Sequence, residues 1–465
     1  MVFSGIVFLG LFFPAVLLLY FGLPFRKWRN YVLLAASLLF YAWGEPLWVL
    51  AMIFTSAVDF INGKWIGKLG ESKYRKWPLI LSLVLDLGIL MIFKYSGFFA
   101  GEIFKLAGVQ IPAWNRPMPI GISFYTFQSL SYTLDVYRGK TKVQHNFLYY
   151  LMYVSMFPQL VAGPIVRYAD IAAQIEDRQE TTEGFWQGAL RFTVGMGKKV
   201  ILANNAGKAA TALLSPALAG GHLPVANAWL GAIFYTFQIY YDFAGYSDMA
   251  IGLGKIFGFD YKENFNYPYI ARSITDFWRR WHISLSSFFR DYVYIPLGGN
   301  RHHLYRNIFV VWALTGLWHG ASWNFILWGL YYGLLLILEK SFFGKYWEKW
   351  KILGHLVTIL LFIYGWVIFY CTDLSFLSRV TRSLLGLDGN RWIDLNGQTW
   401  FLSNLWILPI YIIGSTPYPK LVAGRLFATE KARDIAGSLF VLAIFAISLV
   451  LLVGQTYNPF LYFRF

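Results

Sequence analysis

The chain of 465 residues is poor in charge and has a single cysteine. Only 14% of its residues are charged, whereas 57% are hydrophobic and 20% are aromatic. A soluble globular domain typically has about 25% charged residues. The lone cysteine, Cys371, excludes an intramolecular disulfide and a thiolate-rich metal site. This composition excludes an ordinary soluble protein and indicates a chain that lies largely in a membrane.

Several catalytic motifs are absent as well. No serine or cysteine lies in a nucleophile-elbow pattern, and the chain has no Walker loop, HExxH motif or carboxylate pair. We therefore expect no ATP hydrolysis, no metal site and no acyl-serine on this chain. The net charge of +16 is typical of a membrane protein whose cytoplasmic loops are rich in Lys and Arg, so we expect no nucleic-acid partner.

Long apolar runs recur from end to end, and lipid offers a backbone no hydrogen-bond partner, so the runs are expected to be helices. The sequence predicts an all-α polytopic membrane protein, with one helical bundle formed by residues 1–465. The first run lacks a basic n-region and a small-residue cleavage site, which indicates a retained span rather than a signal peptide. The runs expected to cross the membrane are 3–22, 30–44, 47–61, 78–95, 118–134, about 225–247, 353–371, 400–415 and 435–453.

The positive charges give the expected orientation. Lysines and arginines are concentrated in 23–29 and 62–77 and are absent from the turn between the second and third runs. Cationic loops stay on the cytoplasmic side, so we expect the N-terminus outside. The same rule places the loop 96–117 and the C-terminal segment 457–465 outside.

The middle of the chain is less regular. Residues 147–164 contain two prolines and a glycine, which predicts a broken or re-entrant segment. Residues 259–306 are too charged to cross the membrane and too aromatic to be a free linker, so we expect an ordered block in the cytoplasm or inner leaflet. Residues 307–338 are expected to form a helical hairpin.

The motif Thr-Gly-Leu-Trp-His-Gly-Ala-Ser-Trp-Asn, residues 315–324, places His319 inside an apolar run. An ionisable side chain at such depth is costly, and imidazole can take and return a proton near neutrality. If each arm of the hairpin reaches about half-way through a ~30 Å hydrocarbon core, His319 lies near the midplane at the apex. The alternative is a histidine that only hydrogen-bonds a neighbouring carbonyl.

A second cluster combines cations and indoles in residues 276–285: Trp278, Arg279, Arg280, Trp281 and His282. Guanidinium groups bind phosphate bidentately and indoles stack on aromatic ligands, which favours a phosphorylated ligand. The alternative is anchoring in the headgroup region.

A third cluster, residues 235–248, includes Tyr241 and Asp242 late in an apolar run. It indicates either an aqueous cavity or hydrogen bonds between helices. Together, the three clusters suit transfer of a group from a soluble activated donor to a hydroxyl on the other side of the membrane. A transporter for a lipid-linked sugar is the alternative from another class.

These residues resemble the membrane-bound O-acyltransferase superfamily, and within it the bacterial alginate O-acetyltransferase branch. The resemblance covers nearly the whole chain and includes the Trp-His-Gly motif at 318–320 and the Trp-Arg-Arg-Trp-His motif at 278–282. The segments that carry it are 119–128, 157–164, 242–248, 277–285, 290–300 and 317–320.

The resemblance implies a funnel-shaped helical bundle with a thin central partition, in which His319 is essential and His282 is the second family histidine. It implies acetyl-CoA as a cytoplasmic donor, with no permanently bound cofactor. Donor- or substrate-binding residues are then expected at the cluster 278–281, at Tyr241 and Asp242, and at Asn324.

The resemblance also implies a bacterial plasma-membrane protein, surrounded by lipid, that sends acetyl groups outward. A separate extracytoplasmic acetyltransferase of the serine-hydrolase type would then modify a polysaccharide. A sister branch, which transfers D-alanine from a carrier protein to teichoic acid, remains the alternative within the superfamily.

Overall fold

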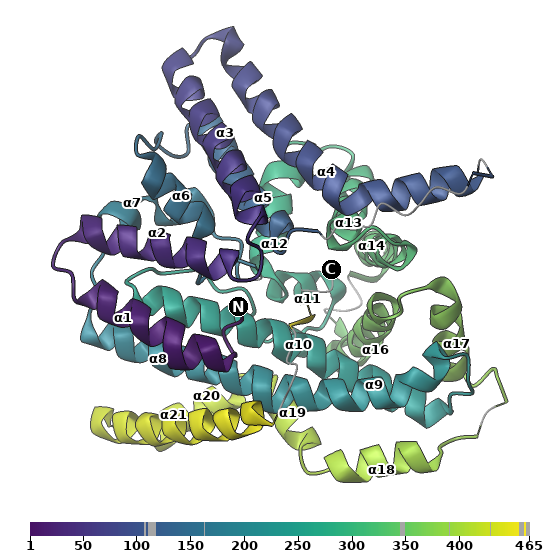
Figure 1. The fold of residues 1–465 in the computed structure, drawn as a ribbon. Coiled ribbons are helices and arrows are strands. Elements are labelled where there is room, and N and C mark those ends of the chain that lie inside the picture. Colours follow the sequence, from purple (N-terminus) through teal and green to yellow (C-terminus); the bar gives the residue numbers. More distant parts are fainter. Residues whose placement is uncertain are drawn as a thin grey trace. The chain divides into compact units, whose positions relative to one another are not determined.

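The computed structural model describes residues 1–106, 108–109, 118–161, 163–344, 349–389, 391–427, 429–454 and 460–461, and these residues form helices and loops without a strand (Figure 1). Residues 110–117 of the predicted outward loop, and 457–459 and 462–465 of the predicted outward C-terminal segment, lie outside the described residues. The chain groups into two compact units. Unit 1 contains Met1–Gly195, Tyr246–Lys262 and Leu452–Arg464, and unit 2 contains Met196–Gly245 and Glu263–Leu451.

Unit 1 is built from the N-terminal helices, drawn in purple to blue in Figure 1, and from the last turns of α10. The elements of this part of the chain are η1 (Phe8–Phe12), α1 (Phe13–Phe21), α2 (Arg26–Ala42), α3 (Trp48–Leu69), η2 (Lys73–Arg75), α4 (Lys76–Leu106), α5 (Ile122–Tyr137), α6 (Phe147–Ser155), α7 (Tyr168–Glu176) and α8 (Thr182–Gly197).

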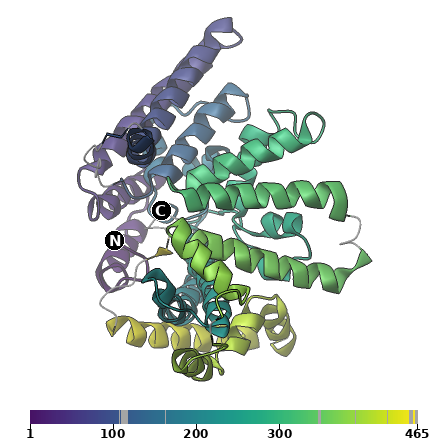
Figure 2. The ribbon, with the colours of Figure 1, turned by 90° about the vertical axis from the view of Figure 1, so that its right-hand side faces the viewer.

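Unit 2 contains the helices drawn in green to yellow in Figure 2. Its elements are η3 (Lys198–Ala203), α9 (Asn204–Leu218), α10 (Val225–Ile256), η4 (Pro268–Ile270), α11 (Ile274–Arg280), α12 (Ile283–Phe289), η5 (Arg290–Tyr294), α13 (Leu304–His319), α14 (Trp323–Leu338), η6 (Glu339–Phe343), α16 (Lys351–Tyr370), α17 (Leu374–Leu384), α18 (Leu395–Asn404), α19 (Leu408–Gly414), α20 (Tyr418–Leu426) and α21 (Glu430–Val453).

Among the described residues, five helical segments are long and apolar enough to cross a membrane: Trp48–Leu69, Lys73–Gly101, Trp323–Phe343, Lys351–Tyr370 and Asp434–Val453. Four of them coincide with predicted crossing runs. The remaining one is the second arm of the predicted hairpin. Its 21 residues would span roughly 31 Å as a helix, so this arm is long enough to cross rather than to stop half-way. The prediction of an all-α polytopic membrane protein is confirmed.

The predicted crossing run 400–415 does not form one continuous helix, because the structure divides it into α18 and α19. Pro409 lies in the first turn of α19. Proline has no N–H to continue a helix, and its ring clashes with the carbonyl four residues earlier. Hydropathy alone does not register this interruption.

The predicted broken segment after 147 is not helical beyond Ser155, where α6 ends. Its backbone is buried and turns through Val161, which has a left-handed φ of 79°. The N–H of Phe157 donates to Ser37 Oγ at 3.0 Å, so a side chain of α2 supplies a partner that a helix would have supplied. Such irregular backbone is tolerated where protein groups satisfy it.

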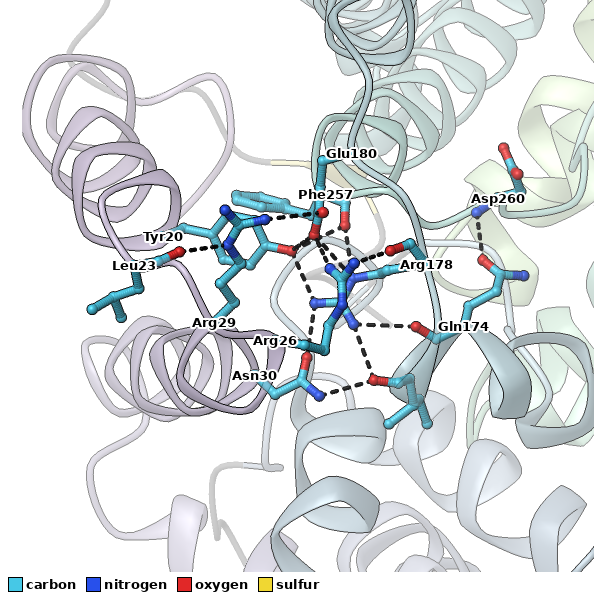
Figure 3. Close-up of polar contacts among 11 residues, drawn as sticks. Tyr20, Leu23, Arg26, Arg29, Asn30, Gln174, Arg178, Glu180, Phe257 and Asp260 are labelled. Carbon is cyan, nitrogen blue, oxygen red and sulfur yellow. Dashed lines mark hydrogen bonds and ion pairs between the residues drawn. The ribbon is translucent and has the colours of Figure 1, made fainter.

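A buried arginine, Arg178, connects the elements of unit 1 (Figure 3). Its guanidinium donates to Phe257 O at 2.9 Å, Gln174 O at 3.1 Å, Ile175 O at 3.2 Å, Tyr20 Oη at 2.9 Å and Asn30 Oδ1 at 2.8 Å. Glu180 accepts from Arg26 and, at 3.1 Å, from Arg29. All five N–H groups of Arg178 are therefore used, a pattern that lysine cannot reproduce.

In unit 2, α13 and α14 form a hairpin whose contact depends on glycine. A Cβ at Gly316 would lie 2.5 Å from the carbonyl oxygen of Phe325, and one at Gly329 would lie 2.5 Å from that of Trp312. The Cα of each glycine is 3.1–3.2 Å from the Cβ position of the other. Small residues at such contacts let helix backbones approach closely.

We expect Arg178→Ala to destabilise the protein by about 3–5 kcal/mol, because it leaves buried carbonyl and hydroxyl groups of four elements without their donor. Thermal unfolding of the purified protein in detergent measures this. Arg382→Ala is the control, since the Arg382 side chain is 60% exposed and its ion pair with Asp388 is a surface pair. Equal melting temperatures for the two variants would contradict the role of Arg178.

We expect Gly316→Val to destabilise the protein by about 1–3 kcal/mol, the usual cost of overpacking. The added side chain meets backbone atoms, which cannot move aside as a side chain could. The control, Leu314→Val, places the same residue at a 40% exposed position of the same helix. Melting temperatures in detergent compare the two variants. A Gly316→Val protein as stable as the control would show that α13 and α14 can separate without cost.

Candidate active site

His319 is the last residue of α13, and the sequence around it forces the helix to end there. Gly320 is extended, with φ 178° and ψ 161°, and α14 begins at Trp323. A Cβ at Gly320 would lie 2.4 Å from the ring of Phe325, so only glycine fits beside the histidine. The imidazole is 5% exposed and has the rings of Trp328 and Phe369 edge-on at 4.9 and 5.1 Å between centroids.

His282 lies in the bend between α11 and α12, where its backbone has a left-handed φ of 44°. The side chain is buried, and its Nδ1 is 3.1 Å from Oδ1 of Asn264. Burial lowers the pKa of the His282 imidazole to about 3, so the ring is neutral at pH 7. The same Asn264 oxygen accepts from the N–H and hydroxyl of Ser284 at 3.1 and 2.8 Å.

Both histidines line one cavity of about 450 Å³ that lies entirely within unit 2. Helices α11, α12, α13 and the end of α14 form its wall. Its lining includes the buried His282 and His319 and the exposed residues Arg279, Arg290 and Lys340. A ligand-sized space therefore connects two imidazoles with accessible cations.

The cations of the cavity differ in their partners. Arg290 donates to the carboxylate of Asp291 at 2.7 Å, and this hydrogen bond raises the pKa of Arg290 above its ordinary value. Arg279 makes no ion pair with any described residue, and neither does Lys340. Within the described part of the chain, Arg279 therefore offers a guanidinium group without an ion-pair partner to an anionic ligand.

Helix α11, which presents Arg279, is attached to η6 at its N-terminus. Glu339 is buried, and its carboxylate accepts from the N–H groups of Ile274 at 2.7 Å and Thr275 at 3.2 Å. A carboxylate satisfies the free N–H groups of a helix start and matches its positive dipole end. This contact fixes α11 relative to the hairpin that carries His319.

The two tryptophans of the sequence motif line the cavity but pack mainly against protein. Trp278 has the rings of Trp312 and Tyr332 at 4.7 and 4.8 Å, and Trp281 has Trp366 at 4.6 Å. Trp281 is 2% exposed. The two indoles therefore form part of the cavity wall and are held in place by the aromatic rings behind them.

Four of the predicted binding residues lie outside the cavity lining. Arg280 donates to Asp276 at 2.8 Å, and Asp242 forms a buried ion pair with Lys199 at 2.5 Å. Tyr241 donates to the carbonyl of Tyr411 at 2.6 Å. Asn324 donates to the carbonyl of Phe369 at 3.3 Å and accepts from Ser322. The contact of Arg280 lies within α11, and the contacts of the other three connect separate elements of unit 2.

The structure adds residues that sequence reasoning did not assign to the site. Asn264 and Glu339 orient His282 and α11, and Arg290 and Lys340 add charge to the cavity. Asn264 lies in the block 259–306 that is expected to be ordered, but its contact with His282 depends on the chain returning after η4 and α11. No sequence pattern shows that return.

The site combines two buried imidazoles, a cavity and accessible cations, and the described residues contain no group of three His, Cys, Asp or Glu side chains that could hold a metal ion. Imidazole can activate a hydroxyl, and guanidinium can hold a phosphate. The arrangement therefore suits transfer of a group from a phosphate-bearing donor to a hydroxyl.

Known proteins resemble this chain over most of its length. The model of the membrane-bound O-acyltransferase family matches residues 34–381. A probable alginate O-acetylase, AlgI, of Pseudomonas aeruginosa is 38% identical, and the match covers 100% of both chains. A peptidoglycan O-acetyltransferase of Helicobacter pylori is 34% identical over 77% of this chain and 74% of its own. A teichoic acid D-alanyltransferase of Bacillus subtilis is 31% identical over 56% of this chain and 70% of its own. The chain therefore belongs to the membrane-bound O-acyltransferase family and is a multi-pass membrane O-acyltransferase.

Proposed function

We propose that this protein takes an acetyl group from cytoplasmic acetyl-CoA and passes it across the plasma membrane for O-acetylation of an extracytoplasmic polysaccharide. The observation that carries the proposal is the shared cavity, which is lined by His282, His319 and Arg279. The acetyl group is supported by the relatives named O-acetylase, which match the chain over its whole length.

In the proposed reaction a hydroxyl attacks the thioester carbonyl of the donor. The new C–O bond forms, the C–S bond breaks, and the hydroxyl proton ends on the sulfur of the free thiol, so no further reactant is needed. His319 acts as the general base, or orients and activates the hydroxyl. His282 supports either the donor thioester or the path of the proton.

The cations of the cavity suit the phosphates of coenzyme A. Arg279 offers a guanidinium fork without an ion-pair partner among the described residues, and Lys340 adds a second such charge. Loops rich in lysine and arginine stay on the cytoplasmic side, which supports entry of the donor from the cytoplasm and an external N-terminus. The donor is a substrate, and we propose no permanently bound cofactor.

The acceptor side is proposed to involve a second protein. An extracytoplasmic acetyltransferase of the serine-hydrolase type would receive the acetyl group and place it on the polysaccharide. The peptidoglycan and alginate named for the relatives are both polysaccharide-containing polymers. We therefore propose a polysaccharide-containing polymer as the acceptor and do not choose between alginate and peptidoglycan.

D-alanyl transfer from a carrier protein is the second candidate within the family. The teichoic acid D-alanyltransferase of Bacillus subtilis matches only 56% of this chain, against 100% for the alginate relative of Pseudomonas aeruginosa. Whole-length similarity favours acetyl transfer. Label from radioactive acetyl-CoA that enters membranes containing this protein and its partner supports acetylation, and label that enters only from a D-alanyl carrier contradicts it.

We expect His319→Gln to reduce acetylation of the polymer by about 10²–10⁴-fold, the usual effect of removing a catalytic acid or base. Acetyl content of the cell-surface polymer, at matched protein level, is the measurement. His145→Gln is the control, because His145 is exposed and outside the cavity. Normal acetylation in the His319→Gln strain would show that the imidazole has no role in the transfer.

We expect Arg279→Gln to raise the KM for acetyl-CoA about tenfold or more with a smaller effect on kcat, because a charge-assisted hydrogen bond to phosphate is worth about 1.5–3 kcal/mol. Arg280→Gln is the matched control, since the adjacent arginine pairs with Asp276 and lies outside the cavity lining. Initial rates at varied acetyl-CoA in membrane vesicles measure both. A larger rise in KM for Arg280→Gln would place the donor on the other side of α11.

A further inference from the structure

Asn264 is buried at the centre of a small hydrogen-bond network around His282. Its Oδ1 is 3.1 Å from the N–H of Ser284, 2.8 Å from the hydroxyl of Ser284 and 3.1 Å from Nδ1 of His282. Its backbone carbonyl accepts from the N–H of Ile283 at 2.9 Å. The residue thus holds the bend between α11 and α12 at both sides of the imidazole.

The contact with Ser284 determines which end of the Asn264 amide faces the histidine. A backbone N–H can only donate, so the atom 3.1 Å from it must be the amide oxygen. A flipped amide would set its NH₂ against that N–H. The Asn264 atom that faces Nδ1 of His282 is therefore an acceptor. The Ser284 hydroxyl also lies 3.4 Å from Nδ1, but it donates its hydrogen to the same Asn264 oxygen at 2.8 Å, so Nδ1 carries the hydrogen.

The surroundings keep the ring neutral. His282 is 2% exposed, with Phe243 edge-on at 4.6 Å and Trp318 at 6.0 Å between ring centroids. A charged imidazolium is costly in such an environment. A neutral imidazole carries one hydrogen, so if Nδ1 holds it, Nε2 is the nitrogen with a lone pair.

We propose that Asn264 is a positioning residue that fixes His282 as the Nδ1–H tautomer, which leaves Nε2 to act on the substrate as a hydrogen-bond acceptor. This inference rests on the proposed function. It selects between the two roles given to His282 there. Nε2 without a hydrogen cannot donate to the thioester carbonyl, so His282 acts on a group that brings its own hydrogen, such as the acceptor hydroxyl or the released thiol.

The chemical nature of the group beside Nδ1 determines how basic the His282 imidazole is. A carboxylate beside Nδ1 would stabilise the imidazolium and favour full proton transfer to Nε2. The neutral amide of Asn264 supplies orientation and tautomer choice without that charge. His282 therefore orients its ligand, and the role of general base proposed above stays with His319.

Nitrogen NMR of the full-length protein in detergent, labelled with ¹⁵N-histidine, tests the tautomer directly. The chain has 7 histidines, so the His282 signals are identified by their loss in His282→Gln. We expect a protonated Nδ1 and an unprotonated Nε2. A protonated Nε2 in the wild-type protein would overturn the proposal.

Two substitutions at Asn264 test whether this residue determines the tautomer of His282. Asn264→Asp keeps an oxygen acceptor beside Nδ1, so it should retain the Nδ1–H tautomer and make the ring more basic. Asn264→Ala removes the acceptor, and we expect Nε2–H to become populated. If Asn264→Ala retains the wild-type tautomer, the residue does not position the ring.

Kinetics add a readout that loss of stability does not reproduce. We expect Asn264→Ala to lower kcat about tenfold or more with little change in the KM for acetyl-CoA, since one oriented hydrogen bond is lost from the reacting centre. Asn404→Ala is the control, a buried asparagine of unit 2 outside the cavity. A rise in KM alone, or an equal loss of kcat in the control, contradicts the positioning role.

Different results would contradict the proposed function and the role of Asn264. Normal acetylation by His282→Gln would remove this histidine from the proposed reaction, whatever its tautomer. A protonated Nε2, together with loss of activity in His282→Gln, would keep the proposed function and reject the role of Asn264.

Discussion

The absence of water as a hydrogen-bond partner is the constraint on which this structure depends. Each buried polar group of a membrane protein needs an acceptor or donor from the protein itself. Arg178 meets this requirement in unit 1 with five acceptors, and Asn264 meets it in unit 2 with one oxygen shared by three donors. The same requirement that stabilises the fold therefore fixes the orientation of a site histidine. Substitutions in these networks affect stability and chemistry through one mechanism.

Close packing of helices positions the side chains of the site. Gly316 and Gly329 let α13 and α14 approach until backbone meets backbone, and Gly320 ends α13 at the imidazole. Glu339, at the other end of α14, caps α11 and so sets where Arg279 lies. The catalytic candidates thus come from separate elements, but each is attached to the same hairpin. A rigid frame of this kind holds reacting groups in place without needing a bound ligand.

The sequence predicted what depends on local composition. The apolar runs 47–61, 353–371 and 435–453 became long helices because length and hydropathy are local properties. The run 400–415 is divided between two helices, because a proline interrupts a helix whatever the mean hydropathy of the run. Arg279 and Arg280 were predicted together, but adjacent residues on a helix point about 100° apart, so only one faces the cavity. The joining of His282, His319 and Asn264 is a product of tertiary packing that no spacing expresses.

Neutrality of His282 has a physical reason. A permanent charge on its imidazole would have to be desolvated beside a second histidine in a cavity of about 450 Å³. The proposed transfer exchanges a thioester and a hydroxyl for an ester and a thiol, so reactants and products carry the same charge. Charge then develops only in the transition state, where a base needs to take a proton briefly and return it. An amide rather than a carboxylate beside His282 fits this requirement, because it orients the ring without adding a fixed charge that both ground state and product would have to bear.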